Sequence, residues 1–272
     1  MAYLVLSILC SVLIANLLMA FNRRSKESVL PVFLGNYLVA ASFSLISVPG
    51  MQPALPWGDL GLGVLTGAFF LANFWVYQRS IIINGLSLSV GVMRVAMIIP
   101  VLLAVLAFGE KISLLNGLGV VLGLAAFSLK ADPKELHNFL WIVGLFLISG
   151  LTDASLKIYK ELGSGQESAF VFVIFASAFV FTLLAILLGK LPLRIKSVLY
   201  GCVLGIPNRY STVFFLKGLD SVPAALAYPL VAVSIVLLSI VCDIVIWNKR
   251  PSTRDALLWA LMALSLVLLN LK

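Results

Sequence analysis

The chain has 272 residues, of which 62% are apolar and 11% are charged. Soluble globular proteins are about 45–50% apolar and about 25% charged. With a mean hydropathy of +1.13, this composition excludes a water-soluble domain and predicts an all-α integral membrane protein. The net charge of +8 is spread over short connectors, which argues against nucleic-acid binding, and three widely spaced cysteines argue against a disulfide scaffold.

The elements predicted in chain order are ten transmembrane helices. A span needs about 20 apolar residues. The first apolar run, 1–21, precedes its basic residues instead of following them, so it is predicted to be a retained helix and not a cleaved signal peptide. The predicted spans are 2–21, 29–48, 60–79, 85–108, 113–130, 139–158, 167–188, 197–217, 222–247 and 254–271.

An internal repeat divides the predicted spans into two groups of five, residues 1–133 and 134–272, within one membrane domain. The two halves align with an offset of about 139 residues, and with one residue of slippage this places Gly63 and Gly67 of the third span opposite Gly201 and Gly205 of the eighth. Because five is an odd number, the halves must have opposite orientations in the membrane. This inverted repeat is typical of secondary transporters.

The connectors on the two sides of the predicted bundle differ in charge. One side has twelve basic residues in and beside its connectors, and the other has five. The positive-inside rule places the richer side in the cytoplasm, and hence both termini outside it. The predicted location is a bacterial inner membrane.

Ten spans in two halves resemble the drug/metabolite transporter superfamily, of the EamA type. The distinctive residues are Pro100 in a long apolar helix, then Phe108-Gly109-Glu110-Lys111, then a helix that contains Gly117, Gly119 and Gly123. In the second half, Asn248-Lys249 replaces the Gly-Glu pair and Ser239 replaces the proline. The resemblance implies export of a small metabolite, and it implies termini in the cytoplasm, in contrast to the charge count.

Four ionisable residues lie at predicted membrane depth, namely Arg94, Asp153, Arg209 and Asp243. Such residues are costly in lipid and are usually functional or paired. One interpretation is two structural Arg–Asp pairs. The other is that an arginine binds the anionic group of a substrate through its planar guanidinium. Asp153 lies one turn before Lys157, so a pairing of these two residues along the helix is a further interpretation.

The polar residues around Arg209 are the strongest candidates for a binding site. Pro207 is predicted to break its helix, with Asn208, Arg209 and Tyr210 exposing polar groups at mid-depth, and the alternative is an ordinary kink. Asn73 and Tyr77 share one helix face in the third span. The sequence -Tyr228-Pro229- is predicted to form a further kink or hinge. The predicted substrate-binding residues are therefore Arg209, Arg94, Asn208, Tyr210, Asn73, Tyr77 and Asp153.

The chain is thus predicted to be a secondary transporter and not an enzyme. It has no phosphate-binding loop, and no metal site, catalytic residue or cofactor is predicted. The favoured substrate is an amino acid or related carboxylate, exported by alternating access through a central cavity between the two halves, with Arg209 and Arg94 holding the anionic group. Two modes of transport fit the sequence equally well: coupling to a proton carried by Asp153 or Asp243, and uniport without a coupling ion. The alternative function is a lipid flippase or scramblase that holds a phosphate head group.

Overall fold

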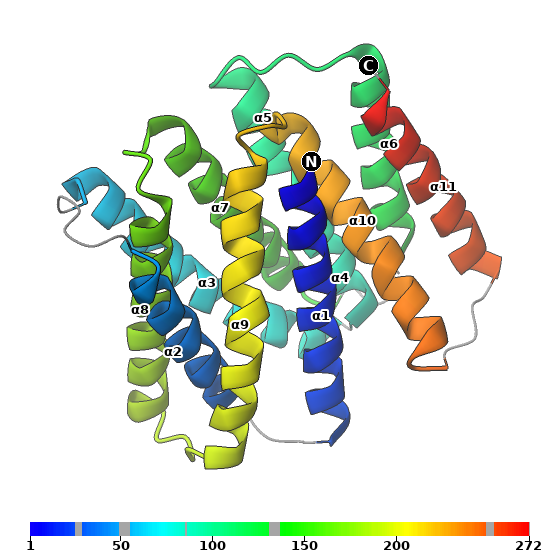
Figure 1. Ribbon diagram of the computed structural model, residues 1–272. Helices are drawn as coiled ribbons and strands as arrows, with labels where there is room; N and C mark the ends of the chain where they lie inside the picture. Colours follow the sequence, from blue (N-terminus) through cyan, green and yellow to red (C-terminus); the bar gives the residue numbers. More distant parts are fainter. Residues whose placement is uncertain (25–28, 49–54, 85, 131–136, 249–252, 272) are drawn as a thin grey trace. The chain divides into compact units, whose positions relative to one another are not determined.

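The computed structural model describes residues 1–24, 29–48, 55–84, 86–130, 137–248 and 253–271. The described residues are helical apart from short connectors. In chain order the helices are α1 (Ala2–Arg24), α2 (Leu30–Ile46), α3 (Trp57–Asn84), α4 (Leu86–Val95), α5 (Ile98–Leu106), α6 (Leu114–Lys130), α7 (Phe139–Leu162), α8 (Glu167–Leu188), α9 (Ile195–Gly218), α10 (Ala224–Val245) and α11 (Thr253–Asn270). They are labelled in Figure 1.

Helices α4 and α5 correspond to one predicted span, so the eleven helices of the described residues cover the ten predicted apolar runs in order. The interruption covers only Ala96 and Met97. Pro100 has no N–H to donate to the carbonyl of Ala96 one turn earlier. That carbonyl instead accepts the N–H of Ile99 at 3.0 Å in a tighter turn. The proline therefore explains the interruption of this span.

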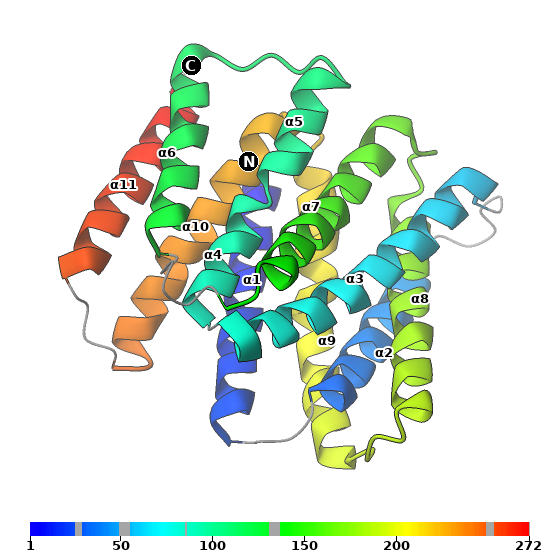
Figure 2. The same cartoon turned by 180° about the vertical axis from the view of Figure 1, so that it is seen from behind.

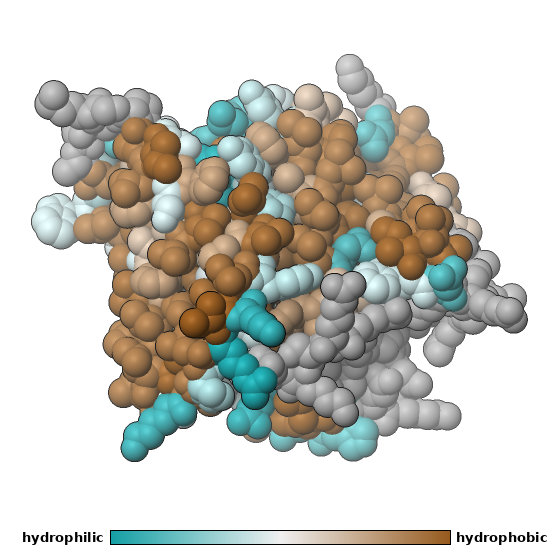
Figure 3. All heavy atoms as spheres, turned by 60° about the horizontal axis from the view of Figure 1, so that its bottom comes forward, coloured by the Kyte–Doolittle hydropathy of each residue, from teal (hydrophilic) through white to brown (hydrophobic). Residues whose placement is uncertain are grey.

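Five of the helices are long and apolar enough to cross a membrane: Ala2–Phe21, Trp57–Asn84, Phe139–Leu162, Glu167–Leu188 and Ala224–Cys242. Their outward faces are apolar, as in α1, where Val5, Leu9 and Leu13 are exposed at four-residue intervals. Apolar side chains also cover much of the surface drawn in Figure 3. A surface of this kind is stable in contact with lipid and not with water, which is consistent with a multi-pass membrane protein.

The helices form two compact units. Unit 1 comprises Met1–Leu71 and Ile158–Gly218, and unit 2 comprises Ala72–Lys157 and Leu219–Lys272. Each unit therefore combines segments from both sequence halves, and α3 and α7 contribute to both. The core of unit 1 includes the fully buried side chains of Tyr37, Phe170 and Phe175.

Within unit 1, α9 packs against α1 and α2 (Figure 1). A Cβ atom on Gly201 would collide with the carbonyl oxygen of Val32, and one on Gly205 would lie 2.5 Å from that of Asn36. The backbones of α2 and α9 therefore touch along a stripe of small residues. Since both contacts advance along the two chains together, α2 and α9 run parallel.

A second close contact of the same kind joins α3 to α8. A Cβ atom on Gly63 would lie 2.8 Å from the side chain of Val173, and one on Gly67 would lie 2.6 Å from the carbonyl oxygen of Ile174. These two helices also run parallel over the contact. The glycines that the predicted repeat would pair, Gly63 and Gly67 with Gly201 and Gly205, thus lie in two parallel, close helix packings.

Within unit 2, α6 and α11 lie side by side in both views (Figure 2). The amide nitrogen of Asn116, buried in α6, donates to the carbonyls of Leu268, Leu269 and Leu271 at 3.0–3.2 Å. Carbonyls at the end of a helix have no partner within it, so Asn116 satisfies part of the end of α11. Ser265 donates to the carbonyl of Gly119 at 2.7 Å, which joins the two helices near their middle.

Candidate functional site

The predicted binding residues are divided between the two units. Unit 1 contains Asn208, Arg209 and Tyr210, all on α9. Unit 2 contains Asn73 and Tyr77 on α3, Arg94 on α4 and Asp153 on α7. The site is therefore described as two clusters, one in each unit.

The first cluster is centred on Arg209, whose side chain is 5% exposed. Arg209 lies two turns after Gly201 and one turn after Gly205, so it continues the face of α9 that packs on α2. Its Nε donates to the hydroxyl of Ser44 at 3.4 Å, and its guanidinium carbon lies 4.7 Å from the centre of the Tyr210 ring. Both contacts are with neutral groups. Among the residues described in unit 1, no carboxylate forms an ion pair with it.

Asn36 of α2 extends this cluster. Asn36 is fully buried, and its side-chain oxygen accepts a hydrogen bond from the amide of Asn208 at 3.1 Å. The other polar atom, Nδ2, is buried with no hydrogen-bond partner in the structure. A buried donor without a partner costs about 1–3 kcal/mol. The contact between α2 and α9 thus leaves one buried hydrogen-bond donor, Asn36 Nδ2, without an acceptor.

The predicted break at Pro207 is wrong. Helix α9 continues from Ile195 to Gly218 with Pro207 inside it, and α10 likewise continues through Pro229. A proline removes only one backbone hydrogen bond, and packing on both sides of it can hold the helix together. Arg209 is therefore presented by an uninterrupted helix face and not by unwound backbone.

The second cluster, in unit 2, brings together three predicted residues from three helices. Arg94 lies within electrostatic range of Tyr77 and Asp153. The Nε of Arg94 is buried and has no hydrogen-bond partner. Asn73 lies one turn before Tyr77, and its oxygen accepts the hydroxyl of Ser149 at 2.7 Å. This last contact joins α3 to α7 and is a helix-packing contact of the kind common in membrane proteins.

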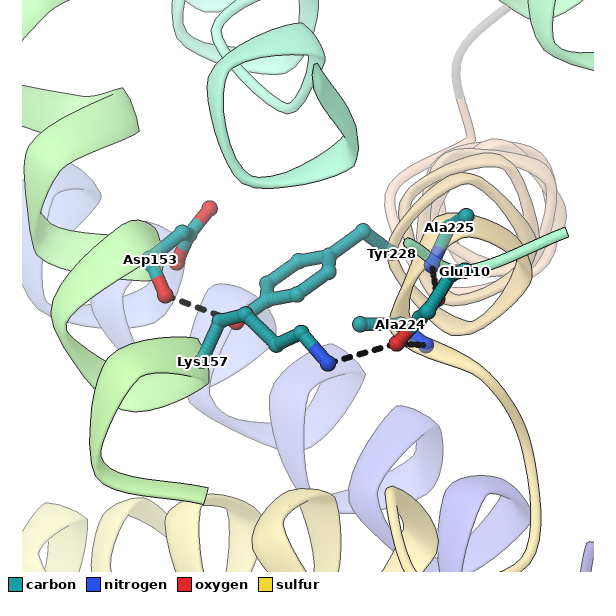
Figure 4. Close-up of polar contacts among 6 residues, drawn as sticks. All are labelled: Glu110, Asp153, Lys157, Ala224, Ala225 and Tyr228. Atoms are coloured by element: carbon teal, nitrogen blue, oxygen red, sulfur yellow. Dashed lines mark hydrogen bonds and ion pairs between the residues drawn. The ribbon is translucent and has the colours of Figure 1, made fainter. Parts of the chain in front are cut away.

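The predicted pairing of Asp153 with Lys157 is also wrong. Lys157 is 2% exposed and forms an ion pair with Glu110 at 2.5 Å. Figure 4 shows the Lys157 ammonium turned toward Glu110, with the Asp153 carboxylate pointing away from it. Among the described residues, Asp153 forms no ion pair with Lys157. The predicted pairing of an arginine with Asp243 falls outside the side chains that the structure describes.

Sequence reasoning did not find the role of Glu110. This residue lies in the connector between α5 and α6, and its two oxygens accept the N–H groups of Ala224 and Ala225 at 3.0 and 2.8 Å. These N–H groups begin α10 and have no partner within that helix. The carboxylate therefore caps a helix N-terminus, where negative charge is favourable, and also faces a buried ammonium. The only signal in the sequence was the Gly109-Glu110 pair. It contributed to the resemblance to a transporter family, but it did not indicate what Glu110 contacts.

The surroundings of Glu110 change its acidity. Burial by itself raises the pKa of this carboxyl, but the N–H of Ala225, the ammonium of Lys157 and the N–H of Ala224 lower it by more. The net result is a pKa below the usual value for glutamate. The folded protein thus holds Glu110 in its charged form.

This lowered pKa predicts an acid-dependent loss of stability. A carboxylate with a depressed folded-state pKa stabilises the fold above its unfolded pKa of about 4.3 and loses that contribution as the pH falls through the folded value. The stability difference between wild type and Glu110→Gln should therefore be largest near neutral pH and shrink below about pH 4.3. Thermal unfolding in detergent from pH 7 to pH 3 measures it, with Glu161→Gln, at an exposed site, as the control. A difference that stays constant with pH would contradict the assignment.

Of the comparisons with known proteins, one shows the fold and none assigns an activity. No family model matches the chain. The chain is 24% identical to an uncharacterized protein of Haemophilus influenzae, over 92% of this chain and 90% of that protein. A crystal structure of a protein with 16% sequence identity superimposes with a TM-score of 0.80, over 99% of this chain and 98% of that one. The helical fold is thus shared with a solved structure, while the resemblance to the drug/metabolite transporter superfamily stays a prediction.

Proposed function

We propose that this protein is a secondary transporter of a small polar metabolite that carries an anionic group, with an amino acid or related carboxylate favoured. In this proposal it belongs to the drug/metabolite transporter superfamily, is embedded in a bacterial inner membrane, and exports its substrate by alternating access between two inverted five-helix repeats.

The observation that carries the proposal is the environment of Arg209. An arginine stays charged at any physiological pH, and an unpaired charge at the centre of a bilayer costs about 2.5–3.5 kcal/mol on insertion scales. The partners described for Arg209 in its unit are a hydroxyl and an aromatic ring. An anionic ligand would supply the missing counter-charge, and Asn36 would supply a further donor.

The glycine packing supports the inverted repeat. Gly63 and Gly67 pack α3 on α8, and Gly201 and Gly205 pack α9 on α2. If the halves are repeats, the third span corresponds to α9 and the second to α8, so the two contacts exchange under the same symmetry. In such a repeat, α3 and α9 would be equivalent helices. Each would be able to rock against the helix on which its glycines pack.

Substitution of Arg209 tests the proposal. A substrate is first found by thermal-shift screening of the purified protein against amino acids, nucleotides and phosphorylated metabolites, and its transport is then measured in proteoliposomes. Arg209→Gln should fold and express normally but lose transport at least tenfold, because the ligand loses its counter-charge. Arg209→Lys is the control, since it keeps the charge but loses the planar fork and should retain part of the activity.

Two results would count against the proposal. One is a stable Arg209→Gln protein with normal transport. The other is an unstable Arg209→Gln protein whose stability returns when Asp153 or Asp243 is also neutralised, because the arginine would then be a structural partner of a carboxylate. Selective movement of phospholipid in the same vesicles, with no metabolite transported, would indicate a flippase instead.

A further inference from the structure

The first turn of α10, residues 223–228, is tied to two neighbouring segments by side-chain hydrogen bonds. Its first two N–H groups have no partner within α10 and donate to the two oxygens of Glu110 at 3.0 and 2.8 Å. The hydroxyl of Tyr228 donates to the backbone carbonyl of Asp153 at 2.7 Å (Figure 4). These contacts join the turn to the connector between α5 and α6 and to α7.

Pro229 weakens the connection between this turn and the rest of α10. The proline lies inside the helix and has no N–H to donate to the carbonyl of Ala225, four residues earlier. A proline within a helix is a common site of bending. The turn is thus joined to the remainder of its helix by one backbone hydrogen bond fewer than usual, and residue 229 is the point about which it can bend.

The ion pair between Glu110 and Lys157 can stay intact when the turn moves. Lys157 is 2% exposed and lies 2.5 Å from Glu110, and its ammonium also lies 5.2 Å from the centre of the Phe108 ring, in the same connector. Breaking this pair would leave a buried ammonium without a counter-charge, which is costly. Separating the turn from Glu110 breaks only bonds to neutral N–H groups, which water can replace at a helix end. The weakest joint is therefore the one between Glu110 and α10.

The chain leads directly from the proposed binding residue to this turn. Arg209 lies on α9, which continues as a helix to Gly218, and only residues 219–223 separate that helix from α10. A helix can transmit a displacement along its length because it is a rigid element. A shift of α9 on substrate binding would therefore reach the first turn of α10 through a short connector.

We propose that residues 223–228 form a gate, which Glu110 and Tyr228 hold closed and which opens by bending at Pro229. Its role rests on the proposed transport function, to which it adds a part of the chain that moves when a substrate held at Arg209 is released. Opening separates the turn from Glu110 and exposes the side chain of Ala225, which is fully buried in the closed gate.

The reactivity of a cysteine at position 225 measures this opening. Ala126, on α6, is as completely buried as Ala225 but has no part in the gate, so it provides the matched control. Ala225→Cys and Ala126→Cys are each made in the full-length protein after its three native cysteines are replaced by alanine, and modification by a water-soluble maleimide is followed in detergent. Position 225 should react at least tenfold faster than position 126, because only the gate opens while the protein stays folded.

Three further variants move the gate in opposite directions. Tyr228→Phe and Glu110→Gln each remove part of the latch and should speed the reaction at position 225 at least tenfold, without a matching change at position 126. Pro229→Ala restores a backbone N–H to bond the carbonyl of Ala225 and should bring the reaction close to the rate at position 126. It should also slow the flux of radiolabelled alanine, leucine or phenylalanine in proteoliposomes without loss of stability, an effect that a purely structural proline would not produce.

The outcomes separate the gate from the transport function. Equal rates at positions 225 and 126 would overturn the gate, as would a rate at position 225 that neither Tyr228→Phe nor Pro229→Ala alters. Flux that Pro229→Ala leaves unchanged would contradict its role in transport. Absence of any transport by wild type would remove the proposed function, whereas the reaction rates, which require no substrate, would still decide whether residues 223–228 open.

Discussion

Replacing Glu110 by glutamine should destabilise the protein by about 3–5 kcal/mol, the cost typical of removing one partner of a buried ion pair. The change removes the carboxylate that faces the nearly inaccessible ammonium of Lys157. It also weakens the cap on α10, because glutamine offers a single acceptor where the carboxylate oxygens receive the N–H groups of both Ala224 and Ala225. Thermal and denaturant unfolding of the purified protein in detergent measure the loss.

Removing the other partner of this ion pair, Lys157, should destabilise the protein less. Lys157→Met leaves the Glu110 carboxylate with its two helix N–H groups and with a side chain that is 15% exposed, so that charge keeps partial compensation. We also expect Lys157→Met to recover much of the stability lost in Glu110→Gln, because it removes the buried charge that has lost its counter-ion. Strictly additive losses in the double variant would contradict a direct pair. Loss of stability in Lys157→Met greater than in Glu110→Gln would show that the lysine has the larger structural role.

Local patterns in the sequence were sufficient to predict the helices. The run predicted at 167–188 coincides with α8, because Gly163-Ser164-Gly165 precedes it and Gly189-Lys190 follows it. Apolar runs bounded by such residues define helix ends without reference to the rest of the chain. The number and order of the helices follow from the same signals.

The effect of each proline could not be predicted in the same way. Pro100 interrupts its span, whereas Pro207 and Pro229 lie inside continuous helices. All three remove one backbone hydrogen bond. Whether the helix then stops depends on what packs beside it, as at Gly201 and Gly205 of α9, and those neighbours are distant in sequence.

The ion-pair partners of the charged residues also could not be predicted from the sequence. Lys157 was assigned to Asp153 because only near neighbours along a helix can be paired from sequence. Its partner Glu110 is 47 residues away, in a connector between two other helices. The sequence did identify Arg94, Asp153 and Arg209 as costly and therefore important charges. That Arg209 lies in one compact unit and Arg94 and Asp153 lie in the other could be seen only in the folded structure.

Adding a single methyl group at Gly201, by the substitution Gly201→Ala, should destabilise the protein more than the same change at the other two glycines compared below. A Cβ atom at this position would collide with the carbonyl oxygen of Val32, which belongs to the backbone of α2 and cannot turn aside. Gly201→Ala should therefore separate α9 from α2 and destabilise the protein by about 1–3 kcal/mol, the usual cost of overpacking. Gly205→Ala, whose Cβ would lie 2.5 Å from the carbonyl of Asn36 and 2.9 Å from Val39, should cost less.

Gly61→Ala provides the matched control, because Gly61 also lies inside a helix but a Cβ there would meet nothing within 4 Å. It should be neutral or stabilising by about 0.5–1 kcal/mol, since alanine favours the helix over glycine. The separation of α9 from α2 would also move Arg209 away from Ser44, to which it donates at 3.4 Å. Gly201→Ala should thus reduce transport as well as stability, with unfolding in detergent and flux in proteoliposomes measured on the same preparation. Equal stability of Gly201→Ala and Gly61→Ala would mean that α2 and α9 are not in backbone contact at this point.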